Sequence, residues 1–267
     1  LVLKARNTKS ITATTVPQKG DDRFAVKSVI RDVENILGLK RIIIKSDQEP
    51  AILALIKRVR AMGKFESVQE QVPVGDSKAN GDVESAVKQV QGMCRTLKLG
   101  LERRIKADID ENHEIMSWLI KHAAALTNRY QVGRDGLSSY RRVKGKNFNK
   151  EVVEFGESVW YLIPKSRGKR KLKSRWESGV WVGVRDESNE HIIGTVDGIT
   201  KSRDIRRKGS DDERWDATAI DCVIGTPWEP IPGKKSEEIP SRIKPVDSGA
   251  SDPDLEIVVP DSIERPK

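Results

Sequence analysis

Two acidic residues lie at the ends of elements that would face a cleft. Asp47 comes just after the β-branched run Arg41–Lys45, so it lies at the tip of a predicted strand. Glu84 lies in the first turn of a predicted helix, and 36 residues separate the two acids. Carboxylates brought together in this way are the ligands of two-metal phosphoryl-transfer sites, which favour hard cations such as Mg²⁺. The alternative is that each is a solvated surface acid.

The helix that begins near Glu84 has two distinct sides. Its apolar positions recur at helical spacing and predict a buried face, made of Val83, Ala86, Val87, Val90, Cys94 and Leu97. A polar stripe runs beside this face and consists of Glu84, Lys88, Gln91 and Arg95. The pattern therefore predicts a helix that packs on one side and presents charges on the other.

The composition favours a polyanionic partner. The chain of 267 residues has 49 Lys and Arg against 40 Asp and Glu, a net charge of +9 and a pI of about 9.5. Nucleic acid is the leading candidate, and a basic protein without a specific partner is the alternative. Two cysteines, Cys94 and Cys222, argue against a disulfide framework or a cysteine zinc site. No apolar run reaches the roughly 18 residues of a membrane span.

The order of predicted elements divides the chain into three parts. Strands and helices alternate over residues 1–150, which predicts an α/β domain with a mixed sheet flanked by helices. Its elements are strands at Leu1–Ala5, Ser10–Val16 and Ile42–Ile44, and helices at Phe24–Leu37, Pro50–Arg60, from about Glu84, and at Glu114–Tyr130. Short alternating runs over residues 151–225 predict a small β-rich module, SH3-like or a barrel. Residues 226–267 have the composition of a disordered tail.

The β-rich module contains a dense basic run. Seven of the eleven residues from Lys165 to Arg175 are Lys or Arg, which predicts binding to a phosphate backbone; a nuclear-import signal is compatible with the same residues. The candidate contacts are Lys169, Arg170, Lys171 and Lys173. We interpret Trp160, Trp176 and Trp181 as core residues rather than as stacking platforms, and His113 and His122 as helix-face or core residues rather than as metal ligands.

On these residues the chain resembles the catalytic core of retroviral and LTR-retrotransposon integrases, an RNase H-like fold with a D,D-35-E triad. Residues 42–50, IIIKSDQEP, resemble the strand and turn that carry the second aspartate, at Asp47. Residues 75–84, GDSKANGDVE, resemble the loop and helix that carry the glutamate, at Glu84. A closing motif of the family is matched by Asn128, Gly136, Ser139-Tyr140 and Gly145-Lys146. The resemblance spans residues 1–146, and more weakly residues 155–208.

The resemblance implies 3′ processing and strand transfer of DNA by a nuclear homo-oligomer, with Mg²⁺ or Mn²⁺ held by Asp47 and Glu84. Lys88 lies where integrases place a DNA-contacting lysine, although a Glu84–Lys88 pair is also a routine helix stabiliser. Arg95, on the same stripe, is a further candidate DNA contact. Asn80, before the helix, is either a capping residue or part of a loop that contacts the element end.

Two departures from the family limit this interpretation. The first catalytic aspartate of integrases lies on a strand before the hairpin assigned to residues 1–16, and no residue of this chain takes its place; we expect a fragment of a longer protein. The family's amino-terminal zinc-binding domain is also missing. The leading hypothesis is therefore an integrase-derived protein that is inactive as given. The alternative is a non-catalytic nucleic-acid-binding protein derived from an integrase.

Overall fold

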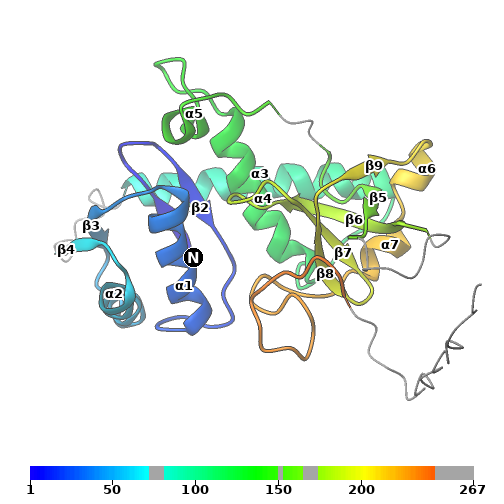
Figure 1. Ribbon diagram of the computed structural model, residues 1–267. Coiled ribbons are helices and arrows are strands. Elements are labelled where there is room, and N and C mark those ends of the chain that lie inside the picture. Colours follow the sequence, from blue (N-terminus) through cyan, green and yellow to red (C-terminus); the bar gives the residue numbers. More distant parts are fainter. Residues whose placement is uncertain (72–80, 150–152, 165–173, 244–267) are drawn as a thin grey trace, which may run out of the picture.

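The computed structural model describes residues 1–71, 81–149, 153–164 and 174–243, which form a mixed α/β protein (Figure 1). The elements in chain order are β1 (Val2–Lys4), β2 (Ile11–Ala13), α1 (Arg23–Arg31), a π-helical turn (Asp32–Ile36), β3 (Arg41–Ser46), α2 (Pro50–Met62), β4 (Glu66–Gln71), α3 (Gly81–Ile105), α4 (Ile115–Tyr130), α5 (Ser139–Lys144), β5 (Ser158–Leu162), β6 (Trp176–Val184), β7 (His191–Thr195), β8 (Gly198–Ser202), β9 (Ile205–Arg207), α6 (Asp211–Arg214) and α7 (Ala217–Asp221).

The predicted N-terminal hairpin is confirmed and lies between two helical layers. β1 and β2 pair antiparallel, with Leu3 opposite Thr12. Because side chains alternate along a strand, Leu3 packs with the buried cluster of α1 and α2, whereas Val2 packs with the cluster of α3 and α4. The hairpin is thus covered by helices on both faces.

β3, α2 and β4 form a β-α-β unit in which the two strands are parallel. Pro50 begins α2, as predicted, since a proline in the first turn gives up no intrahelical hydrogen bond. The single mixed sheet expected over residues 1–150 is not found among the described residues. They form two separate pairs, β1–β2 and β3–β4, because no described strand bridges β1 and β3.

The β-rich module is an open antiparallel sheet of order β8-β7-β6-β5-β9. The barrel expected from its sequence is therefore wrong, because the edge strands β8 and β9 do not pair. A physical reason lies at β8, whose outward N–H groups at Ile199 and Lys201 donate to the carbonyls of Pro230 and Pro240. A strand edge that is already paired with a loop has no donors left to close a barrel.

Residues 226–243 are folded against the rest of the protein, which corrects the tail expected from residue 226 onward. Ile231 and Ile239 are buried, and Trp228 meets Phe24 edge-to-face with ring centroids 6.3 Å apart. Glu237 forms an ion pair of 2.9 Å with Lys27 on α1. A few apolar anchors and the edge of β8 outweigh the polar composition here. Residues 244–267 lie outside the described part of the chain.

α3 and α4 join the two halves of the molecule. Their N-terminal and C-terminal turns respectively pack on the hairpin, and their other ends pack on the five-stranded sheet (Figure 1). The largest buried cluster takes residues from both sides of residue 150, among them Leu101, Ile115, Trp118, Leu119, Phe155, Val180, Ile192 and Ile199. Of the helices described, none is both long enough and apolar enough to cross a membrane.

Candidate nucleic-acid interface

Asp47 lies where the sequence predicts it, directly after the last residue of β3. The side chain is exposed and forms no hydrogen bond or ion pair with another described residue. β3 and β4 are parallel, so their carboxyl ends lie at the same end of this small sheet, where Lys45 and Glu70 form an ion pair of 2.9 Å. Asp47 is therefore a free carboxylate beside an ion pair.

Glu84 is on the first turn of α3, and the predicted two-sided helix is confirmed. Ala86 and Val90 are buried against the hairpin and α4, whereas the four members of the polar stripe are exposed. No ion pair joins Glu84 to Lys88 in the described part of the chain, so Lys88 and Arg95 are exposed cations without a carboxylate partner there. At about 1.5 Å per residue, these two cations are roughly 10 Å apart along the helix.

A series of charges connects the two carboxylate-bearing elements. Arg6, in the hairpin turn, forms an ion pair of 2.8 Å with Asp82 at the start of α3. The hydrogen bond from Lys45 lowers the pKa of the Glu70 carboxyl, and the Arg6 guanidinium lowers this pKa further. Arg6 thus lies near both the end of β4 and the start of α3. The elements that carry Asp47 and Glu84 meet at one end of the molecule (Figure 1).

The residues at this end do not fit a two-metal site. Such a site needs carboxylates that bridge and flank two cations, but the neighbouring acids Glu70 and Asp82 are already paired with Lys45 and Arg6. Within the described ranges, no group of three or more His, Cys, Asp or Glu side chains is placed to hold a metal ion. Asp47 and Glu84 are an exposed pair of acids, and we derive no metal-dependent step from them.

Several predicted contacts fall outside the described residues. Asn80 and the basic residues Lys169, Arg170, Lys171 and Lys173 all belong to this group. The sequence alone places the basic run between β5, which ends at Leu162, and β6, which begins at Trp176.

The three tryptophans of the alternating runs have different environments, and the core interpretation holds for only one of them fully. Trp181 is buried at 2% exposure, and its indole N–H lies 3.1 Å from the His191 ring. Trp160 is 42% exposed, and Trp176 is half-buried. Sequence reasoning missed Trp160 because its run, SVWYLI, is apolar on both faces and gives no sign of which face is solvated.

The histidines are structural, as predicted. His122 is buried between Phe155, stacked at 5.5 Å, and Trp181, edge-on at 5.1 Å. Burial lowers the pKa of His122 to about 3, and the charge of Arg129 acts in the same direction, so the ring is neutral at ordinary pH. His113 accepts a hydrogen bond from the backbone N–H of Ile115 at the start of α4.

Residues of the closing motif that resembles integrases also do structural work. The Asn128 side chain pairs with both backbone groups of Ile11: Oδ1 accepts from its N–H at 2.8 Å, and Nδ2 donates to its carbonyl at 2.6 Å. This double bond pattern fixes α4 to β2. Gly145 ends α5 with a φ of 70°, a conformation that favours glycine.

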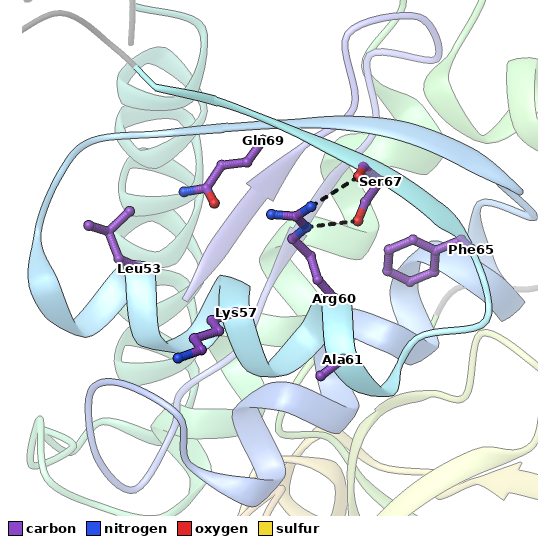
Figure 2. Close-up of a pocket in the computed structure, with 7 residues that line it drawn as sticks. All are labelled: Leu53, Lys57, Arg60, Ala61, Phe65, Ser67 and Gln69. Carbon is purple, nitrogen blue, oxygen red and sulfur yellow. Dashed lines mark hydrogen bonds between the residues drawn. The ribbon is translucent and has the colours of Figure 1, made fainter.

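An open hollow of about 700 Å³ lies between α2 and β4 (Figure 2). Its lining comes from Leu53, Lys57, Arg60, Ala61, Phe65, Ser67 and Gln69. The Arg60 side chain crosses the opening toward Ser67 and donates to its hydroxyl at 3.3 Å. The hollow contains no carboxylate and includes neither Asp47 nor Glu84, so it is separate from the predicted acidic pair.

Comparison with known proteins assigns the chain to no family. No protein-family model matches the sequence, and none of the curated proteins matches it significantly. The proposal below therefore rests on the residues and their arrangement.

Proposed function

We propose that this is an integrase-derived, nucleic-acid-binding protein of an LTR-type retroelement, which binds DNA but does not join it. The observation that carries the proposal is the meeting of Asp47 and Glu84 at one end of the molecule, where the exposed cations Lys88 and Arg95 continue along α3. A strand-end carboxylate, a helix-start carboxylate and a basic helix stripe in this order are what the integrase resemblance implies.

The proposal includes an incomplete catalytic frame. In integrases the first aspartate comes from a strand before the hairpin, and such a strand would supply the third carboxylate. β1 and β3 each pair on one side only within the described residues. A strand paired to both would join the two sheets into the mixed sheet of the RNase H-like fold. Nuclear location and self-association belong to the same proposal, because they rest on the resemblance.

The non-catalytic alternative has its own support. Glu70 and Asp82, the acids nearest to the pair, are held by Lys45 and Arg6 rather than left free to ligate metal. This arrangement suits a surface that binds phosphates more than one that gathers cations. We therefore place DNA binding in the present chain, and catalysis only in a relative that retains all three acids.

The salt dependence of duplex binding tests the proposal. Fluorescence anisotropy would compare the intact chain with a variant in which Lys169, Arg170, Lys171 and Lys173 are changed to Gln. Each lost phosphate contact is expected to reduce the slope of log K against log [salt] by about 0.9. The control replaces four exposed lysines elsewhere that form no ion pair with described residues, Lys40, Lys64, Lys234 and Lys235. Equal slopes for both variants and the parent chain would overturn the proposed contacts.

A further inference from the structure

One face of the five-stranded sheet carries aromatic rings and cations together. Trp160, on β5, is directly opposite Ser178 on β6 and Arg206 on β9. Leu162 and Trp176 form the next cross-strand pair on the same face. Trp160 is 42% exposed, and it has a small serine on one side, so its ring is accessible rather than covered by a large neighbour. This face is a platform at the edge of the sheet.

Two cations are stacked against these rings. The Lys208 ammonium lies 5.3 Å from the centroid of the Trp160 ring, and the Arg206 guanidinium lies 4.5 Å from that of Trp176. Cations at these distances are attracted to the ring faces. Trp160, Trp176, Arg206 and Lys208 are called the aromatic-basic face below.

The cations of this face differ from their neighbours because they have no acidic partner among the described residues. Arg203 pairs with Asp204 at 2.9 Å, Arg207 with the buried Glu157 at 2.7 Å, and Arg214 with Asp211 at 2.6 Å. Arg206 and Lys208 form no such ion pair in the described chain. The aromatic-basic face therefore keeps positive charge available beside an exposed ring.

An exposed indole surrounded by unpaired cations fits one class of ligand well. Unpaired nucleotides have a flat base that stacks on an aromatic ring and a phosphate that attracts lysine and arginine. A base inside a duplex has both of its faces covered by neighbouring bases, so it cannot stack in this way. An anionic lipid or acidic peptide would use the cations but leave the ring without a specific role.

We infer that the aromatic-basic face binds single-stranded nucleic acid, with an unpaired base stacked on Trp160 and the flanking phosphates held by Arg206 and Lys208. In sequence, the basic run of residues 165–173 connects the two strands that carry Trp160 and Trp176, so further cations follow the face along the chain. The inference rests on the proposed function only in that the partner is a nucleic acid, and it uses residues distant in sequence from Asp47 and Glu84.

Binding of labelled single strands tests the inference, with a duplex of the same sequence measured alongside. Trp160→Ala is expected to weaken single-strand binding by about 10-fold, because loss of one stacked base has an effect of this order, and to leave duplex affinity unchanged. Trp160→Phe keeps a stacking ring and is expected to retain most of the affinity. Val196→Ala removes another exposed apolar side chain, at 62% exposure, and serves as the control. Parallel DNA and RNA strands identify which nucleic acid is bound.

Each outcome separates this inference from the proposed function. If Trp160→Ala, folded by its thermal transition, binds single strands as well as the parent chain does, the stacking role is wrong while DNA binding stands. If it weakens single-strand and duplex binding equally, the face has no preference for unpaired bases and the inference is also wrong. If the parent chain binds neither form, the proposed function itself fails. A 10-fold selective loss that Trp160→Phe restores would support the stacking role.

Discussion

The β3–β4 sheet and the five-stranded sheet treat their apolar residues in opposite ways. Ile43 and Val68 face each other across β3 and β4, yet they are 68% and 65% exposed. In the five-stranded sheet, Val159, Ile193 and Ile199 are fully buried. One region has a sheet covered on a single face, and the other has a sheet packed into the main cores. The predicted carboxylates belong to the first region, and the aromatic-basic face belongs to the second.

Charges follow the same division. On the open face of β3–β4, Arg41 pairs with Glu66 and Lys45 with Glu70, both at 2.9 Å and mostly in contact with solvent. Such pairs contribute about 0–1 kcal/mol each. In the five-stranded sheet, the carboxylate of Glu157 is completely buried and receives two hydrogen bonds from Arg207. The comparison teaches that stability is concentrated in the second region, whereas the first is free to carry exposed acids.

The largest effect is expected from Arg207→Ala. This change leaves the buried Glu157 carboxylate without its two bonds of 2.7 and 3.0 Å, and breaking a buried pair costs about 3–5 kcal/mol. Arg203→Ala is the control, because Arg203 pairs with Asp204 in solvent and should contribute less than about 1 kcal/mol. Urea unfolding measures both. A loss for Arg207→Ala no larger than that for Arg203→Ala would remove the contrast between the regions.

Acidification should destabilise the protein through His122. The folded pKa is about 3 against an ordinary value of 6.5, so below pH 6.5 the unfolded chain takes up a proton that the folded chain does not. This contribution is complete above pH 6.5 and is lost as the pH falls toward 3, by about 1.4 kcal/mol per pH unit, or roughly 2 kcal/mol at pH 5. Unfolding at pH 7.5 and pH 5 should show a smaller difference for His122→Leu. An identical difference in both proteins would place His122 in a solvated environment.

The smallest effect is expected on the open face of β3–β4. Val68→Thr should change the free energy of unfolding by less than about 0.5 kcal/mol, because the side chain is already in water. The same substitution at Val159, which is fully buried, should cost about 1–3 kcal/mol for the unpaired hydroxyl. Similar losses at the two positions would mean that the face of β3–β4 is covered in solution.

Local signals were sufficient for most elements. The hairpin, the start of α2 at Pro50 and the two-sided α3 depend on neighbours within a few residues, and all were predicted. Arrangements between distant segments were not predictable in this way. Pro230 and Pro240 cap the edge of β8 through backbone carbonyls, which carry no signature in the side-chain sequence. The same carbonyls account for the missing barrel and for part of the order in residues 226–243.

The candidate site was predictable to a similar extent. The exposure of Asp47, Glu84, Lys88 and Arg95 agrees with their predicted positions on a strand tip and a polar stripe. The charges of Arg6 and Lys45 beside them were missed, because these partners come from other elements. Trp160 was missed because strand register, rather than alternation, decides which ring of an apolar run faces solvent.

One measurement tests most directly the claim that this chain binds DNA without joining it. Labelled duplex carrying element-like ends is incubated with the protein and Mg²⁺ or Mn²⁺, and both the retained complex and the covalent products are quantified. The account predicts a salt-sensitive complex and no joined or 3′-processed product. Joined product that disappears in Asp47→Asn would show a complete active site and contradict the account, and absence of any complex would contradict it as well.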